Sequence, residues 1–129
     1  MKKILAVLFV SLLFCAAQVF AASLVTPNVI KTAFPAKSDA QVEKAILAGA
    51  KKRGWIASKT ADGEIEAVLN IRVHMIAVTI KYAKDGYTIE YKNSSEMKYN
   101  AKKNVIHSKY NNWVENLDKS IQYSLNYSN

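Results

Sequence analysis

The run from Glu64 to Ala83 most constrains the fold, because apolar residues alternate along it and turn signals stand at both ends. The pairs Asp62-Gly63 and Asp85-Gly86 mark those turns. As one strand the run would extend about 66 Å at roughly 3.3 Å per residue. A compact domain of this length is only about 35 Å across, so the run must fold back on itself.

Apolar side chains change parity within this run. They occupy odd positions from Ile65 to Ile71 and even positions from Ile76 to Ile80. A hairpin loop with an even number of residues keeps both sets on one face of a sheet. We place the loop within Arg72–Met75, and we expect four residues because the segment lacks the Gly or Asn of a two-residue turn.

The same parity argument predicts the strand pairs across Asp85-Gly86. The expected partners are Tyr82 with Tyr87, Ile80 with Ile89, and Val78 with Tyr91. A further strand over Trp55–Lys59 completes a four-stranded antiparallel meander, whose other face is polar and expected to be solvated.

A helix is predicted before the meander. Ser38 and Gln41 form a capping box, and apolar residues then recur at helical spacing until Gly54, which indicates a helix over residues 39–53. Gly49 lies on its apolar face, where the missing side chain would let the sheet approach closely.

A second helix is predicted after the polar segment Asn93–Lys103. Asn104 is its expected N-cap, and apolar residues follow at helical spacing. We expect Trp113 to be buried against Ile80 and Ile89. The sequence therefore predicts an α+β two-layer sandwich in the order α-β-β-β-β-α, with both helices on one face of the sheet.

The first 21 residues have the pattern of a secretory signal peptide, with Lys2 and Lys3 before a short apolar segment. We expect cleavage near Ala21 and a periplasmic or secreted protein, in which residues 22–37 form an extended arm and residues 38–129 form one domain. Cys15, the only cysteine, leaves with the signal. The alternative is lipidation at Cys15, which would hold the protein at a membrane, although Phe14 stands where a small residue is usual.

Three short stretches have a distinctive composition: VTIKY at 78–82, YKNSSEMKY at 91–99 and IHSKYNNWV at 106–114. Together they resemble a family of small uncharacterised exported or periplasmic proteins and putative lipoproteins of Gram-negative bacteria. The resemblance implies a place in the cell envelope and supports the predicted fold. It brings no catalytic residues.

Basic residues give the chain a formal net charge of +8, and many of them lie in two stretches. The candidate binding residues are Lys51, Lys52, Arg53, Lys98, Tyr99, Lys102, Lys103 and Lys109. In an exported protein such a surface attracts lipid or polysaccharide phosphates, cell-wall acids or acidic proteins, whereas the compartment excludes nucleic acid. The alternative is a solvated surface that balances a helix C-terminus and keeps a loop soluble.

An alternative polar site comprises Arg72, His74, His107 and Asn111. The histidines could serve as a general base or as metal ligands, but neither has an Asp or Glu three or four residues away, so we assign no metal. A pair of Ser94 or Ser95 with His107 would suggest a hydrolase, although no Gly-x-Ser-x-Gly motif is present. The alternative for the histidines is structural hydrogen bonding, the alternative for the serines is bonding to local backbone, and the alternative for Asn111 is a place on the polar face of a helix.

We therefore expect a non-enzymatic exported domain that binds an envelope protein or an anionic envelope polymer through its basic edge and segment 93–109. No cofactor and no catalytic residue are assigned, and the sequence leaves the oligomeric state open. Two alternatives stand beside this prediction: a small hydrolase that uses His107 or His74, and a lipid-anchored assembly factor.

Overall fold

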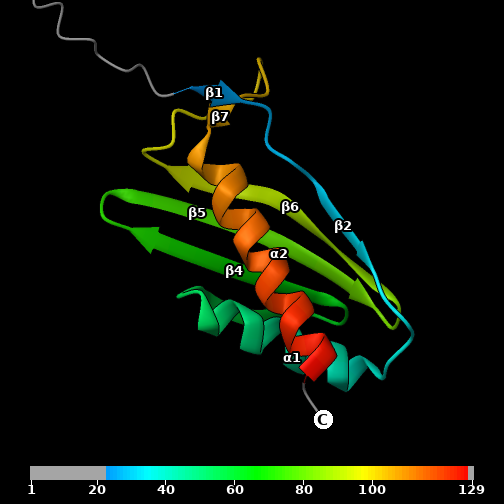
Figure 1. Cartoon of the computed structure of the whole chain (residues 1–129). Coiled ribbons are helices and arrows are strands. Elements are labelled where there is room, and N and C mark those ends of the chain that lie inside the picture. The colour runs from blue at the N-terminus through cyan, green and yellow to red at the C-terminus, as the bar shows by residue number, and fades with distance from the viewer. Residues whose placement is uncertain (1–22, 128–129) are drawn as a thin grey trace, which may run out of the picture.

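The computed structural model describes residues 23–127, so the expected signal peptide and Cys15 lie outside the described residues. The fold is α+β, as predicted, and its main sheet is antiparallel (Figure 1). The elements are β1 (Leu24–Val25), β2 (Ile30–Ala33), α1 (Asp39–Lys52), β3 (Ile56–Ala61), β4 (Glu64–Ile71), β5 (His74–Ala83), β6 (Gly86–Ser95), β7 (Ile106–His107) and α2 (Lys109–Tyr127). No helix in the described part of the chain is long and apolar enough to cross a membrane.

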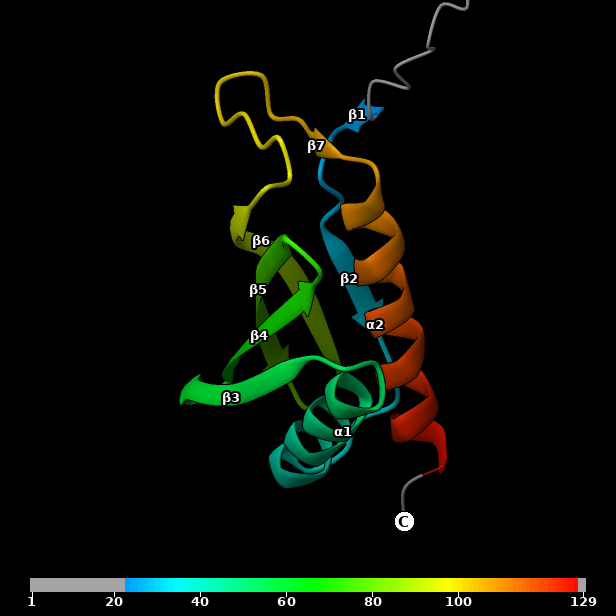
Figure 2. The same ribbon diagram turned by 90° about the vertical axis from the view of Figure 1, so that its left-hand side faces the viewer.

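The main sheet has five strands in the order β2-β6-β5-β4-β3, not the four expected. The additional strand is β2, which pairs with β6 at the edge of the sheet and comes from the predicted arm. The sequence signal failed because β2 spans only four residues and its place is decided by distant pairing. Figure 2 shows β2 at the edge of the sheet, beside α2.

Helix α1 begins as its capping box predicts. The Ser38 hydroxyl accepts the Gln41 N–H at 3.1 Å, and the Gln41 side chain accepts the Ser38 N–H at 3.0 Å. Gly54 follows the helix with a φ of 81°, a left-handed conformation that costs glycine little.

The hairpin between β4 and β5 has the expected parity and a shorter turn. Ile71 pairs with His74, so only Arg72 and Val73 form the turn, and the expectation of four residues was wrong. Arg72 adopts a φ of 55°, which is the positive φ that tight hairpin turns need. The usual Gly or Asn is thus replaced by an arginine in a left-handed conformation.

The pairing between β5 and β6 is as predicted for all three residue pairs: Tyr82 with Tyr87, Ile80 with Ile89, and Val78 with Tyr91. Beyond these pairs a bulge at Ala77 and Val78 changes the register, and β6 continues to Ser95. The segment expected to be a connection from Asn93 onward therefore begins as strand.

Helix α2 begins at Lys109 and not directly after Asn104. Asn104 has a φ of 50° within a turn, and β7, which pairs with β1, begins two residues later at Ile106. The prediction of an N-cap at Asn104 was wrong, because Ile106 and His107 pair with β1 as a strand and the helix begins only after them. The His107 side chain instead accepts the Lys109 N–H at 3.0 Å, at the first residue of the helix.

The two helices pack closely on each other where α1 carries Gly49. A Cβ atom at Gly49 would lie 2.7 Å from the Cα atom of Ile121 in α2. The close approach that we expected from the sheet is therefore made by the second helix.

The core lies between the helices and one face of the sheet. Its fully buried residues include Ile46, Ile65, Val78, Ile80, Ile89, Tyr110, Leu117 and Ile121. Trp113 is only partly buried, and its ring centre lies 6.1 Å from that of His74. The burial expected of Trp113 is therefore only partial, since Trp113 packs against the edge of the core, and Tyr110 is the aromatic residue of α2 that the core encloses.

Candidate functional site

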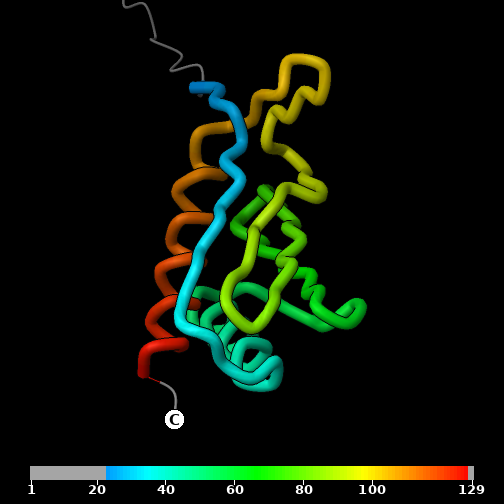
Figure 3. Tube along the Cα trace, turned by 90° about the vertical axis from the view of Figure 1, so that its right-hand side faces the viewer, coloured from blue at the N-terminus to red at the C-terminus, as the bar shows by residue number. Residues whose placement is uncertain are grey.

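A hollow of about 1010 Å³ opens where β5 begins and β6 ends, below the segment that leads to β7. Its lining comprises His74, Tyr91, Lys92, Asn93, Ser94, Glu96, Met97, Lys98, Tyr99 and His107. Figure 3 shows the chain between β6 and β7 projecting beyond the sheet at this end. We call this the end hollow, and we call residues 96–105 the lysine loop.

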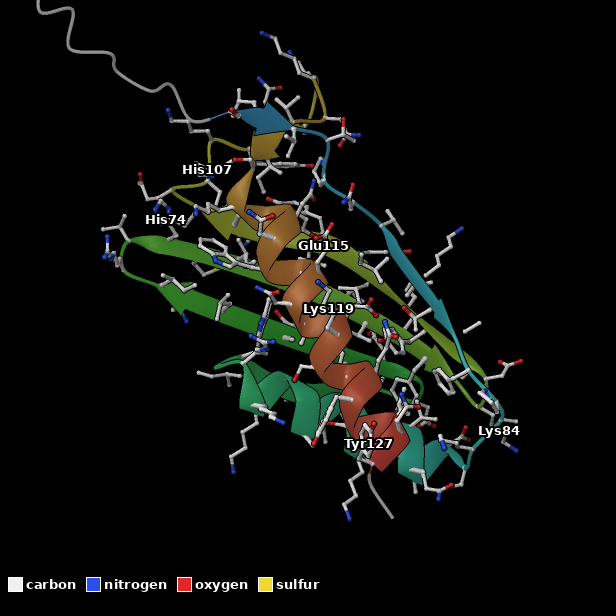
Figure 4. All side chains as sticks on the ribbon, viewed as in Figure 1. His74, Lys84, His107, Glu115, Lys119 and Tyr127 are labelled. Atoms are coloured by element: carbon white, nitrogen blue, oxygen red, sulfur yellow. The ribbon has the colours of Figure 1, made fainter. Side chains whose placement is uncertain are left out.

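The end hollow brings together the two histidines that the sequence singled out. His74 is the first residue of β5, His107 is the last residue of β7, and their ring centres are 6.0 Å apart (Figure 4). Each ring is oriented by the backbone: His74 Nδ1 lies 2.7 Å from the Glu96 carbonyl oxygen, and His107 Nδ1 accepts the Lys109 N–H.

Arg72 and Asn111, the other two residues of the predicted polar site, do not join the histidines in lining it. Arg72 is exposed in the turn between β4 and β5. Asn111 fastens the N-terminal segment, because its side chain donates to the Thr26 carbonyl at 3.1 Å and accepts the Asn28 N–H at 2.8 Å. Its role is structural.

Burial lowers the pKa of His107, and electrostatic interactions with His74, Lys98 and Lys109 lower it further. The imidazole therefore stays neutral at neutral pH. A neutral ring is required for its contact with α2, since Nδ1 can accept the Lys109 N–H only while it carries no proton.

Tyr91 and Tyr99 line the aromatic side of the end hollow, and the buried Tyr110 packs against Tyr91 in the core. The rings of Tyr91 and Tyr99 stack with centres 4.1 Å apart, and Tyr91 meets Tyr110 edge-on at 5.8 Å. The Tyr91 and Ser94 hydroxyls are 2.7 Å apart. Within residues 23–127 neither histidine hydrogen-bonds a serine, so the structure does not assemble the Ser-His pair considered from the sequence.

The hydroxyl of Tyr110 is buried and has no hydrogen-bond partner among the described residues. Burial raises its pKa, and the neighbouring Tyr91 and Tyr99 raise it further. The group is thus held as a neutral phenol. A buried polar group without a partner destabilises the fold, so this hydroxyl is an unusual feature of the core below the hollow.

The lysine loop is held in a defined shape. Glu96, Lys98 and Asn104 adopt positive φ values of 57°, 53° and 50°. Met97 is buried between them, and its carbonyl accepts the His107 N–H at 2.9 Å. Non-glycine residues seldom adopt this conformation unless surrounding contacts favour it, so contacts with the domain, such as the Met97 carbonyl with the His107 N–H, stabilise the conformation of the loop.

The predicted basic edge divides into two clusters. Lys98, Lys102, Lys103 and Lys109 are exposed on and beside the lysine loop. Lys51, Lys52 and Arg53 lie at the end of α1, where the Lys52 ammonium is 4.1 Å from the ring centre of Tyr123 in α2. Lys109 and Tyr123 are separated by about 21 Å along α2 at 1.5 Å per residue.

Sequence reasoning identified the histidines and Tyr99 but missed Tyr91, Met97 and Tyr110 as parts of one site. The segment after β6 looked like a polar connection, and no periodic pattern shows that Tyr99 returns to stack on Tyr91. The only available signal was the close spacing of aromatic and apolar residues in 91–99. Within the described residues, no three His, Cys, Asp or Glu side chains group in a way that could hold a metal ion.

Comparison of the chain with protein-family models, curated proteins and solved structures finds no match. The resemblance to exported Gram-negative proteins therefore stays a prediction.

Proposed function

We propose that the protein is an exported, non-enzymatic binding module that takes up an anionic polymer of the bacterial cell envelope at the end hollow and the lysine loop. One observation carries the proposal: the lysine loop, which has three non-glycine residues at positive φ, presents several lysines beside a hollow lined by histidine, tyrosine and amide groups. Binding sites commonly combine a concave surface with a few convergent polar groups.

The charges of this cluster are available to a ligand. Within residues 23–127, Lys98, Lys102, Lys103 and Lys109 take part in no salt bridge. Exposed ammonium groups that are close in space raise the local concentration of anions. This favours a partner with repeated negative charge over a neutral one.

Export supports an envelope polymer as that partner. Residues 1–21 have the composition of a signal peptide, and phosphate and carboxylate groups are abundant among the anions of an envelope. A version lipidated at Cys15 would use the same site from a membrane anchor.

Hydrogen bonding around the histidines favours binding over hydrolysis. A catalytic base needs a nucleophile within reach and a third group that orients it. Here the Ser94 hydroxyl hydrogen-bonds the Tyr91 hydroxyl, and Nδ1 of each histidine hydrogen-bonds a backbone group.

The proposal is tested by removing charge at one cluster and not at the other. Lys98, Lys102 and Lys103 are changed together to Gln, and the control changes Lys51, Lys52 and Arg53 to Gln, so that both variants lose equal charge. Binding to purified lipopolysaccharide is measured by calorimetry at low and high salt. We expect the loop variant to bind about tenfold more weakly, a loss of about 1.4 kcal/mol, and the control to bind like the parent.

Salt should weaken the binding of the parent protein, since exposed charges are screened beyond about 8–10 Å at physiological ionic strength. Equal losses in both triple variants would show that only net charge matters and would contradict a site at the lysine loop. Binding by the loop variant as tight as that of the parent at both salt concentrations would reject the proposal.

A further inference from the structure

The two histidines of the end hollow present different chemistry to it. A carbonyl oxygen can only accept, so in the neutral ring of His74 the proton is on Nδ1, which faces the Glu96 carbonyl at 2.7 Å. His107 Nδ1 accepts a backbone N–H at 3.0 Å, so in its neutral ring the proton is on Nε2. His74 thus offers an acceptor at Nε2, and His107 offers a donor.

This combination suits hydroxyl groups. The ring centres are 6.0 Å apart, and both rings line the end hollow. A hydroxyl donates and accepts, so one hydroxyl or two adjacent ones can satisfy both nitrogens. A metal ion needs a lone pair on each ligating nitrogen, and Nε2 of His107 carries its proton. The pair is therefore better matched to a polyol than to a metal ion.

An aromatic platform lies in the same hollow. Tyr99 is 39% exposed and stacks on Tyr91, so the platform is open to solvent at Tyr99. Aromatic faces carry partial negative charge and attract the positively polarised C–H groups of a ring such as a sugar. The contact between the Tyr91 and Ser94 hydroxyls orients the platform in advance, which reduces the entropy lost on binding.

The charges that line the end hollow are suited to an acidic ligand with a single negative group. Two lysines line it, and one of them, Lys92, is paired with Glu66 at 3.1 Å. Lys98 takes part in no salt bridge within the described residues. Glu96 also lines the hollow, and its negative charge limits the net positive charge there. One unpaired ammonium is suited to one carboxylate or phosphate.

We infer that the end hollow binds one sugar ring that carries one acidic substituent, a carboxylate or a phosphate. The ring packs on Tyr99, its hydroxyls bridge His74 and His107, and the acidic group meets Lys98. This inference rests on the proposed function and names the unit of the anionic polymer that the site recognises.

The test is an NMR titration of the purified exported protein. The probes are glucuronate and glucose 6-phosphate, the controls are glucose and inorganic phosphate, and the signals are the imidazole Cε1–H of both histidines and the ring of Tyr99. We expect saturable shifts with both acidic sugars and a Kd about tenfold higher with glucose. Inorganic phosphate should leave Tyr99 unshifted. The inference is wrong if neither acidic sugar shifts these signals, or if phosphate shifts Tyr99 as strongly as glucose 6-phosphate.

Matched variants distinguish loss of a specific contact in the end hollow from a general effect of substitution on the protein. In His107→Asn the side-chain oxygen can still accept the Lys109 N–H, while the Nε2–H donor is lost. Tyr99→Phe keeps the ring and Tyr99→Ala removes it. We expect His107→Asn and Tyr99→Ala to weaken glucuronate binding about tenfold, and Tyr99→Phe to bind like the parent. Tyr127→Ala, at a residue 73% exposed on α2, serves as the control.

Each outcome bears on one idea. Unchanged affinity in both His107→Asn and Tyr99→Ala overturns the inference, and if Tyr99→Ala fails to fold, His107→Asn decides alone. If polymer binding is salt-sensitive and equally tight in the parent, His107→Asn and Tyr99→Ala, the sugar site is rejected and the proposed function still stands. Glucuronate binding without polymer binding would reject the proposed function and leave the sugar site supported.

Discussion

The Ser120 hydroxyl in α2 donates a 2.8 Å hydrogen bond to the Gly49 carbonyl in α1. The bond lies where the two helices are closest, since a Cβ atom on Gly49 would come within 2.7 Å of the Ile121 backbone. Both small residues are buried. Together they fix how the two helices cross.

Gly49→Ala should destabilise the protein, although alanine is the better helix former. The added Cβ would collide with the Ile121 backbone, which cannot turn aside as a side chain can. Overpacking of this kind costs about 1–3 kcal/mol, more than the roughly 1 kcal/mol that alanine gains in helix propensity. Urea unfolding measures the difference. Ala48→Gly, at the exposed neighbouring position, is the control for propensity and should cost about 1 kcal/mol.

Removal of a buried tyrosine hydroxyl should have opposite consequences at two positions. The Tyr87 hydroxyl donates to the Asp118 carboxylate at 2.5 Å, whereas the Tyr110 hydroxyl has no partner within the described residues. Tyr87→Phe should cost about 1.5–3 kcal/mol, the range for hydrogen bonds to charged groups. Tyr110→Phe should leave the free energy of unfolding unchanged or raise it. A clear loss of stability in Tyr110→Phe would show that its hydroxyl has a partner in solution.

Acid should destabilise the native protein through His107. Its pKa in the fold lies below the ordinary value of 6.5, because burial and neighbouring charges disfavour the imidazolium. A group with a depressed pKa contributes stability above its unfolded pKa, and the contribution is lost as pH falls through the folded value. The free energy of unfolding should therefore decline as pH falls from about 6.5. His107→Asn should flatten that decline, and an identical pH profile in the variant would contradict the assignment.

Alkaline pH should destabilise the protein through its buried tyrosines. Burial raises the pKa of Tyr87, with the Asp118 carboxylate adding to the shift, and burial also raises the pKa of Tyr110. A raised pKa gives stability that is complete below the unfolded value and declines as pH rises toward the folded value. Unfolding free energies should therefore fall above about pH 10, the ordinary tyrosine pKa. Tyr87→Phe should show a shallower fall, and tyrosinate absorbance reports the ionisation directly.

Asn111→Ala should release the N-terminal segment from α2. The side chain makes two hydrogen bonds to the backbone of residues 26 and 28, and those groups have no comparable partner after the change. Hydrogen exchange in residues 24–33 should become faster while the amides of β4 and β5 keep their protection. Asn112→Ala, at the exposed adjacent position, is the control. Unchanged exchange in Asn111→Ala would show that the pairing of β1 with β7 suffices on its own.

Local patterns predicted the parts of the fold that local interactions determine. The capping box at Ser38, the parity of β4 and β5, and the pairing of Ile80 with Ile89 depend on neighbours in sequence or on one hairpin. The turn at Arg72 was shorter than predicted because this arginine takes a left-handed conformation. The four residues of β2 show no alternation of apolar and polar side chains that would mark a strand. β2 is a strand because it pairs with β6, which lies far along the chain.

Local sequence patterns also do not predict how the residues of the end hollow come together. His74 and His107 were candidates by residue type, but only the pairing of β7 with β1 and the course of the lysine loop bring their rings together. The stack of Tyr91 on Tyr99 depends on a chain reversal made by non-glycine residues with positive φ. Such conformations are imposed by surrounding contacts, so residue type alone does not reveal them.

The pairing of the first strands has a consequence for the order of folding. β1 pairs with β7 and β2 pairs with β6, so the part of the described chain that is synthesised first finds its partners only after α1 and the strands from β3 to β6 have been synthesised. Closing such long loops costs entropy before any contact repays it, whereas the hairpins of β3 to β6 form from neighbours. The meander is therefore expected to form early with its β6 edge open, and that edge is exposed to other chains until the N-terminal segment closes over it.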